Sequence, residues 1–194
     1  MAITASLVKE LRDKTGLPMM KCKKALQESD GDVVAAEESL RKQGMKTEGR
    51  SGRSVTEGSM ASYVHHNGRI GVLVELGCET DFVAKNEDFV KLNNDICQQI
   101  AATDPLCINR DQVDSDLLEK EKEIFRSQVE GKPENVVEKI IEGKINAFYK
   151  ERCLLDQPFI DNSKMSVQEH INIFQLKLGE NITVNRFVRY ELGK

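Results

Sequence analysis

The sequence predicts an α+β protein. It has a three-helix bundle over residues 1–54 and a core domain over residues 55–194, where a three-stranded antiparallel sheet packs with helices and a helical hairpin. Three observations support this prediction. Apolar residues recur at helical spacing near the start and again after residue 87. They alternate with other residues between positions 59 and 78 and near the end, as in strands. A segment rich in Gly and Ser separates the first helices from the first strand.

Short amphipathic stretches lie within residues 4–46. Their apolar stripes are Leu7, Val8 and Leu11; Met19, Cys22 and Leu26; and Val33, Ala36 and Leu40. Gly16 and Pro18 separate the first two stretches, and Gly31 and Asp32 provide a helix end and a helix cap before the third. Because helices this short bury little surface alone, we expect them to pack on one another as a compact bundle.

The clearest strand signals follow a predicted linker over residues 46–58, which places a domain boundary near residue 55. A strand over residues 59–66 leads to Asn67 and Gly68, a pair typical of hairpin turns. On the strand that follows, one face carries Ile70, Val72, Val74 and Leu76.

Helical spacing returns after residue 87. One stripe comprises Phe89, Leu92, Ile96 and Ile100, and it ends before Asp104 and Pro105. A charged helix over residues 114–130 and a longer one over residues 134–154 are expected to form the helical hairpin, and a short helix spans about 166–178. In the last strand, one face is predicted to carry Ile182, Val184, Val188, Tyr190 and Leu192, and the other Phe187, Arg189 and Glu191.

Charge and hydropathy argue against several classes of protein. The net charge is −4, so the strongly basic balance typical of nucleic-acid binding is missing and no direct nucleic-acid partner is expected. Local basic groups, among them Lys23 and Lys24, are either solvated faces or a protein-docking surface. Residues 1–11 contain no long apolar run, so we expect neither a signal peptide nor membrane binding, and the expected compartment is the cytoplasm.

The sequence carries no recognisable catalytic or metal-binding motif. The five cysteines are widely spaced and odd in number, which predicts small buried apolar side chains instead of a disulfide framework or a zinc site. Motifs for a nucleophilic serine, a phosphate loop or a zinc hydrolase are missing, so we expect no catalytic residue, no cofactor and no metal. The alternative is an enzyme that uses Cys78 beside Glu79, although no basic neighbour in sequence would activate that thiol.

Residues 78–86 form an unusual segment directly after a predicted strand, because an acidic side chain stands beside an aromatic one. One interpretation is a helix entry, with Thr80 or Asp81 as the cap and with Phe82 and Val83 in the core. The other is a projecting aromatic wedge with a neighbouring carboxylate. The composition of the segment leaves both open.

The same segment, Thr80-Asp81-Phe82-Val83-Ala84-Lys85-Asn86, resembles the signature of the elongation factor Ts family. Residues 7–12, 19–26, 31–44, 154–159 and 185–193 resemble that family in the same order, so the likeness covers nearly the whole chain. The sequence departs from the family at Gly77, where Asn is usual. Its length is similar to that of short members with a single core subdomain.

The resemblance implies a three-helix module of the ubiquitin-associated type and a partner, the GTPase elongation factor Tu. It implies that Asp81 and Phe82 wedge into the partner's nucleotide domain near Mg²⁺, after which GDP leaves. The expected partner-binding residues are therefore Thr80, Asp81, Phe82 and Val83, with Lys23 and Lys24 also facing the partner. Short members are expected to form homodimers. A ubiquitin-binding module is the alternative for the bundle, but it leaves residues 59–194 unexplained.

Overall fold

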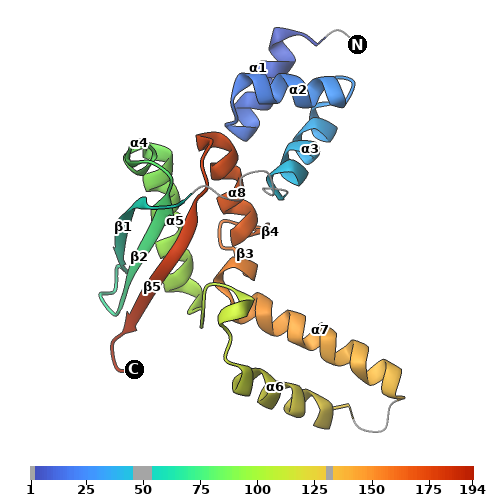
Figure 1. Ribbon diagram of the computed structural model, residues 1–194, viewed down its shortest axis with the longest axis vertical. Helices are drawn as coiled ribbons and strands as arrows, with labels where there is room; N and C mark the ends of the chain where they lie inside the picture. The colour runs from blue at the N-terminus through green and yellow to red at the C-terminus, as the bar shows by residue number, and fades with distance from the viewer. Residues whose placement is uncertain (1–2, 46–53, 130–132) are drawn as a thin grey trace. The chain divides into compact units, whose positions relative to one another are not determined.

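The computed structural model describes residues 3–45, 54–129 and 133–194. In chain order its elements are α1 (Ala5–Thr15), α2 (Met19–Glu28), α3 (Val33–Met45), β1 (Glu57–Val64), β2 (Ile70–Cys78), α4 (Asp81–Ala84), α5 (Glu87–Thr103), η2 (Arg110–Gln112), α6 (Ser115–Ser127), α7 (Glu134–Arg152), η3 (Leu154–Asp156), β3 (Pro158–Phe159), β4 (Asn162–Ser166), α8 (Val167–Leu178) and β5 (Thr183–Glu191) (Figure 1). The chain divides into two compact units. One comprises Met1–Met60, Glu75–Asn93 and Glu169–Asn185, and the other Ala61–Val74, Asn94–Gln168 and Arg186–Lys194.

The first three helices pack around one apolar cluster, as predicted. Its buried members are Val8, Leu11, Leu17, Cys22, Ala25, Leu26, Ala36 and Leu40. Gly16 ends α1 at a φ of 67°, and the Asp32 carboxylate caps α3 by accepting hydrogen bonds from the backbone N–H groups of Val34 (2.9 Å) and Ala35 (3.2 Å). The prediction for Met19 was wrong, because its side chain is 53% exposed and Ala25 is buried on α2 instead. The boundary near residue 55 stays a prediction, since residues 46–53 of the linker lie outside the described residues.

The three-stranded antiparallel sheet has the order β1-β2-β5 and confirms the predicted α+β class. β1 begins at Glu57, two residues before the predicted start, so the end of the expected linker is strand. The hairpin closes where the backbone N–H of His65 donates to the carbonyl of Ile70 (2.9 Å), and Gly68 within it has a φ of 66°. On β2 the predicted apolar face is buried at Val72, Val74 and Leu76.

The predicted faces of β5 are correct only at its start. Val184 is buried, but Val188 and Tyr190 are exposed and Arg189 is directed inward, with its side chain only 10% exposed. Asn185 and Arg186 are both exposed, so the alternation changes phase there, as it does where a strand carries an extra residue. Strict alternation could not predict this change.

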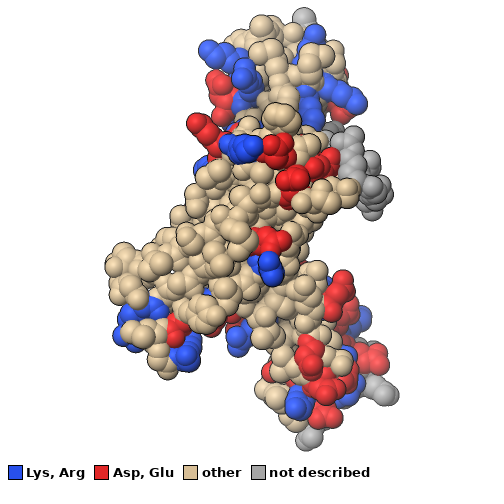
Figure 2. Space-filling model, turned by 60° about the vertical axis from the view of Figure 1, so that its left-hand side comes forward, with Lys and Arg blue, Asp and Glu red and all other residues tan. Residues whose placement is uncertain are grey.

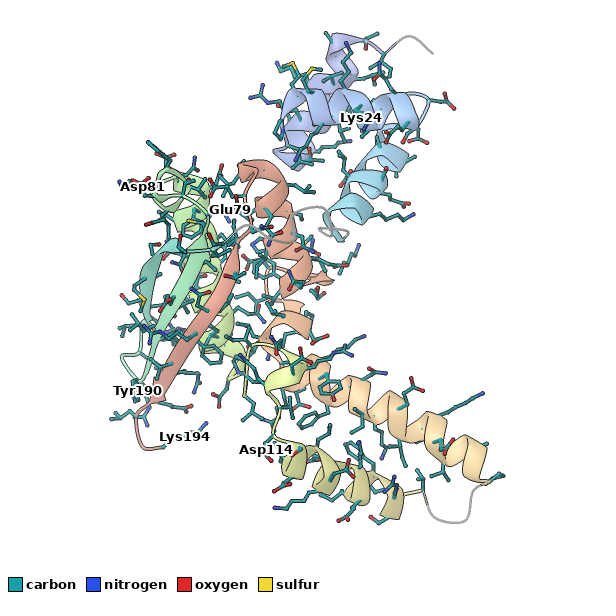
Figure 3. All side chains as sticks on the ribbon, viewed as in Figure 1. Lys24, Glu79, Asp81, Asp114, Tyr190 and Lys194 are labelled. Atoms are coloured by element: carbon teal, nitrogen blue, oxygen red, sulfur yellow. The ribbon has the colours of Figure 1, made fainter. Side chains whose placement is uncertain are left out.

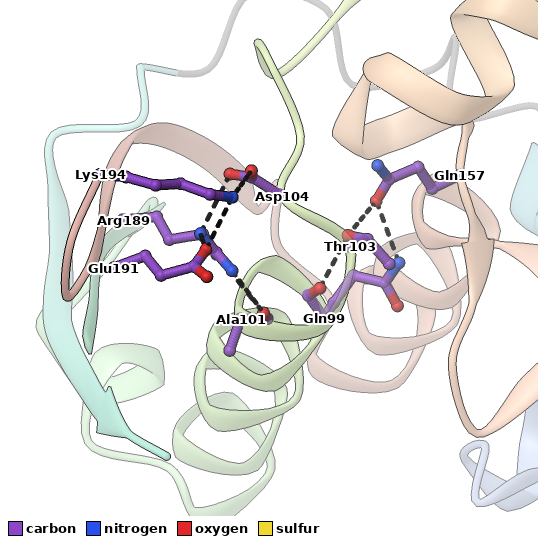
Figure 4. Close-up of polar contacts among 8 residues, drawn as sticks. All are labelled: Gln99, Ala101, Thr103, Asp104, Gln157, Arg189, Glu191 and Lys194. Carbon is purple, nitrogen blue, oxygen red and sulfur yellow. Dashed lines mark hydrogen bonds and ion pairs between the residues drawn. The ribbon is translucent and has the colours of Figure 1, made fainter. Parts of the chain in front are cut away.

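Helix α5 lies along the sheet, and its predicted stripe of Phe89, Leu92, Ile96 and Ile100 is fully buried. The side-chain amide of Asn93 donates to the carbonyl of Ser59 on β1 (3.1 Å). The Arg189 guanidinium on β5 donates to the carbonyl of Ala101 (3.4 Å), and it pairs with Glu191 (2.9 Å) (Figure 4). These contacts attach the middle and the last turn of the helix to strands.

Helices α6 and α7 form the predicted helical hairpin. The ammonium group of Lys144 lies 5.2 Å from the ring centroid of Phe125. No α6 side chain is buried, so this hairpin has a thin core compared with the rest of the chain. The antiparallel pair β3-β4 follows and was not predicted. Behind it, the buried amide oxygen of Gln157 accepts hydrogen bonds from Gln99 (3.1 Å) and Thr103 (2.7 Å) (Figure 4).

Candidate functional site

The candidate site begins where β2 ends. Gly77 and Cys78 are buried there, and the Cys78 thiol donates to the carbonyl of Thr80 (3.1 Å). A Cβ atom at Gly77 would lie 2.7 Å from the Val55 side chain and 2.9 Å from that of Asn185. The departure at Gly77 therefore fits this chain, because a larger residue would require the side chains of Val55 and Asn185 to move.

The short helix α4 confirms half of the helix-entry interpretation. The hydroxyl of Thr80 caps it by accepting a hydrogen bond from the backbone N–H of Val83 (3.4 Å). The predicted burial of Phe82 in the core is wrong, because its side chain is 83% exposed. Val83 is half-buried. The fold therefore uses Thr80 and Val83 to attach the segment and leaves Phe82 in solvent.

Asp81 stands beside the exposed aromatic ring, in the first turn of α4. Its carboxylate forms an ion pair with Lys85 at 2.8 Å, and both side chains are more than half exposed. The hydrogen bond from Lys85 lowers the pKa of Asp81 and raises the pKa of Lys85. Asp81 is consequently a carboxylate at neutral pH, and an exposed pair of this kind can open at little cost when another cation approaches.

A carboxylate distant in sequence holds the start of this segment. Glu180 accepts hydrogen bonds from the backbone N–H groups of Glu79 (3.1 Å) and Thr80 (3.0 Å) and from the Thr80 hydroxyl (2.6 Å). In return, the Glu79 carboxylate accepts a hydrogen bond from the backbone N–H of Asn181 (2.9 Å). Figure 3 shows Glu79 near the end of α8 and Asp81 at the outer edge of α4. Glu180 and Asn181 were not predicted from the sequence, since they are about a hundred residues from the loop and belong to no catalytic motif.

The two predicted lysines belong to a different element. Lys23 and Lys24 are exposed on α2, where Lys24 lies 3.8 Å from Glu28, its neighbour one turn along the helix. They take no part in the contacts of the Thr80–Val83 segment described above. Their positions suit a solvated face and a docking surface equally well.

The cysteines are buried, as predicted: Cys22, Cys78, Cys97, Cys107 and Cys153. Burial raises the pKa of the Cys78 thiol, and the negative charge of Glu180 raises it further. This opposes the alternative of a Cys78 nucleophile, because such a thiol stays protonated at neutral pH.

In the described part of the chain, His, Cys, Asp and Glu side chains form no group of three or more that could hold a metal ion. Among the same residues, no helix has both the length and the apolar character needed to cross a membrane.

The family model and the curated relatives that match this chain carry the same name. The family model described as "Elongation factor TS" matches residues 35–194. "Elongation factor Ts" of Desulforamulus reducens is 56% identical over 195 residues, which cover 99% of this chain and 90% of the relative. The proteins of the same name from Oleidesulfovibrio alaskensis and Thermotoga maritima are 52% and 48% identical, over 99% and 100% of this chain and 98% of each relative.

Proposed function

The chain belongs to the elongation factor Ts family, whose members promote nucleotide exchange on the GTPase elongation factor Tu during translation elongation, and we propose that its Thr80–Val83 segment performs this exchange. The observation that carries the proposal is the 83% exposure of Phe82 on a segment that is otherwise firmly held. Large apolar side chains are usually buried, so an aromatic ring presented to solvent on a fixed loop is a good candidate for contact with a partner.

In this proposal, Phe82 acts as a wedge between elements of the partner's nucleotide domain. Burying such a ring stabilises the complex by about 1.5–3 kcal/mol, which offsets part of the cost of separating the partner's own packing. Mg²⁺ requires near-ideal octahedral geometry, so a small displacement of its surroundings weakens its binding and that of GDP. Because the two binding events are linked, factor and nucleotide weaken each other's affinity by the same ratio.

Asp81 has the supporting role. Its carboxylate is exposed beside Phe82 and ionised, so we propose that it leaves Lys85 and contacts polar groups of the partner near the Mg²⁺ site. Its contribution is smaller than that of Phe82, because water screens an exposed charge.

Exchange of this kind breaks no covalent bond. We therefore propose that the chain is not an enzyme and uses no cofactor, catalytic metal or direct nucleic-acid contact. Translation takes place where ribosomes and elongation factor Tu are found, which supports the cytoplasm as its compartment. Lys23 and Lys24 are proposed to add affinity for the partner through the exposed face of α2.

A homodimer is the proposed assembly. Apolar side chains of β1, β2 and β5, and of the residue after β5, are exposed on the face away from α5: Val64, Leu73, Val188, Tyr190 and Leu192. Figure 2 shows few charged side chains over the strands. Exposed apolar side chains on one face of a sheet support a symmetric interface with a second copy, which would also protect the sheet edges.

The decisive experiment is the release of labelled GDP from elongation factor Tu with and without this protein. We expect a concentration-dependent acceleration that saturates. An unchanged release rate at saturating protein would contradict the proposed function, and a pull-down with ubiquitin as the alternative bait would then test the bundle as a ubiquitin-binding module.

A further inference from the structure

The exposed segment depends on contacts with a distant part of the chain. Helix α4 contains four residues, and a helix this short is not stable alone. Its entry is instead held by the Glu180 carboxylate, which accepts three hydrogen bonds from Glu79 and Thr80. Hydrogen bonds to an ionised acceptor are roughly twice as strong as those between neutral groups.

The turn that carries Glu180 is itself held in place. Gly179 ends α8 at a φ of 84°, and the side-chain amide of Gln175 donates to the carbonyl of Ile182 (2.8 Å), which closes the turn between α8 and β5. Asn181 then returns a backbone hydrogen bond to the Glu79 carboxylate. The segment before α4 and the turn after α8 are thus joined in both directions: Glu180 accepts hydrogen bonds from the segment, and Glu79 accepts one from the turn.

The hydrogen bonds from Thr80 to Glu180 involve the residue that also caps α4. The same Thr80 hydroxyl that donates to Glu180 (2.6 Å) accepts from the Val83 backbone (3.4 Å). Loss of the Glu180 contact therefore removes the acceptor that orients this hydroxyl, and the direction in which Phe82 projects is less firmly set. A wedge that must first be ordered loses affinity and rate to that ordering.

We infer that Glu180 is the positioning residue of the exchange segment: its carboxylate sets the entry of α4 so that Phe82 projects in its active direction before the partner arrives. This inference rests on the proposed role of Phe82. In this inference Glu180 acts through Phe82.

The test is a double-mutant cycle on the full-length protein, with Phe82→Ala, Glu180→Ala and the combined variant, read by stimulated GDP release. We expect Glu180→Ala alone to lower the maximal rate by about tenfold in a protein that is still folded at the assay temperature. In the Phe82→Ala background the same change should have no further effect, since the residue through which it acts is gone. Glu180→Gln keeps an acceptor oxygen and should restore part of the rate. Glu123→Ala, at an exposed site on α6, is the matched control.

The possible results distinguish the proposed function of Phe82 from the positioning role of Glu180. Normal exchange with Phe82→Ala would overturn the proposed function. A slow Phe82→Ala variant together with a normal Glu180→Ala variant would overturn the positioning role alone, as would additive losses in the combined variant. If Glu180→Ala melts much earlier than the parent protein, the cycle is run with Glu180→Gln, and the same non-additivity decides.

Discussion

The Sγ atoms of Cys107 and Cys153 lie 3.6 Å apart, where the residue after α7 pairs with the segment that leads towards α6. Both side chains are buried, and the backbone N–H of Leu154 donates to the carbonyl of Cys107 (2.9 Å) beside them. The spacing of cysteines along the sequence does not predict this contact, because it depends on how the hairpin closes at its base.

Burial controls the chemistry of these thiols. It raises the pKa of Cys153 to about 12 and that of Cys97 to about 11. Only the thiolate reacts, so we expect slow alkylation of the folded protein by iodoacetamide at pH 7 and faster alkylation as the pH rises towards those values. Counting labelled sites by mass spectrometry checks this, with the denatured protein as the fully reactive control. Native mass spectra should show no bound zinc. Rapid labelling at pH 7, or unfolding by a chelator, would contradict this description.

Arg189 should contribute more to stability than its neighbours. Its guanidinium meets the Ala101 carbonyl in the last turn of α5 and the carboxylates of Glu191 (2.9 Å) and Asp104 (3.3 Å), with only 10% of the side chain exposed. Replacing it with Met leaves the Ala101 carbonyl without this donor and leaves the two carboxylates with Lys194 alone, so we expect a loss of about 2 kcal/mol in the free energy of unfolding. Urea denaturation measures this. Lys194→Met, which removes an exposed partner of the same carboxylates, should cost less than about 0.5 kcal/mol. Equal losses of stability in Arg189→Met and Lys194→Met would contradict the larger contribution expected of Arg189.

Arg189 also shows where prediction from the sequence stops. Periodicity correctly predicted α1 to α3 and α5 to α8, and the buried faces of β2 and α5, because those patterns are local. It failed in β5, because the phase change at Asn185 and Arg186 depends on how the strand fits its neighbours. The short pair β3-β4 was missed for a similar reason, since a two-residue strand carries no periodicity.

In the candidate site, too, the local features could be predicted from the sequence and the long-range contacts could not. The sequence indicated Asp81 and Phe82, and a cap at Thr80 or Asp81, because these residues form a local motif; the structure places the cap at Thr80. It left open whether Phe82 is buried, which only the packing of the segment decides. It could not indicate Glu180, because the hydrogen bonds from Glu79 and Thr80 join parts of the chain about a hundred residues apart.

The α2 lysines should affect affinity and not the exchange step. Replacing Lys23 and Lys24 by Ala is expected to raise the protein concentration needed for half-maximal GDP release, while the maximal rate stays the same. Lys9→Ala, at an exposed site on α1, is the matched control. Deleting residues 1–54 should have a larger effect in the same direction. Unchanged half-maximal concentrations in both experiments would show that the bundle does not dock.

The sheet face should mediate self-association. Sedimentation at micromolar concentration is expected to give a species of twice the chain mass of 21.9 kDa. Tyr190→Glu places a charge at a 72% exposed position on β5 and should shift the protein to monomer, because an unpaired charge is costly inside an apolar interface. Val34→Glu, at a 65% exposed position on α3, should leave the mass unchanged. A single species of about 22 kDa in the parent protein would rule out the homodimer.

Phe82 should determine the rate of exchange without affecting the fold. Its ring is 83% exposed, so Phe82→Ala removes few contacts from the free protein and should leave the melting temperature nearly unchanged. A buried Phe would behave differently, since its truncation costs about 3–5 kcal/mol. We expect the same variant to slow stimulated GDP release by at least tenfold, equivalent to about 1.4 kcal/mol of lost transition-state stabilisation. Asp81→Ala should slow it less, because that carboxylate is exposed and screened. Melting and GDP release are measured on the same preparations. A Phe82→Ala protein that is stable but exchanges normally, or one that is severely destabilised, would exclude the wedge.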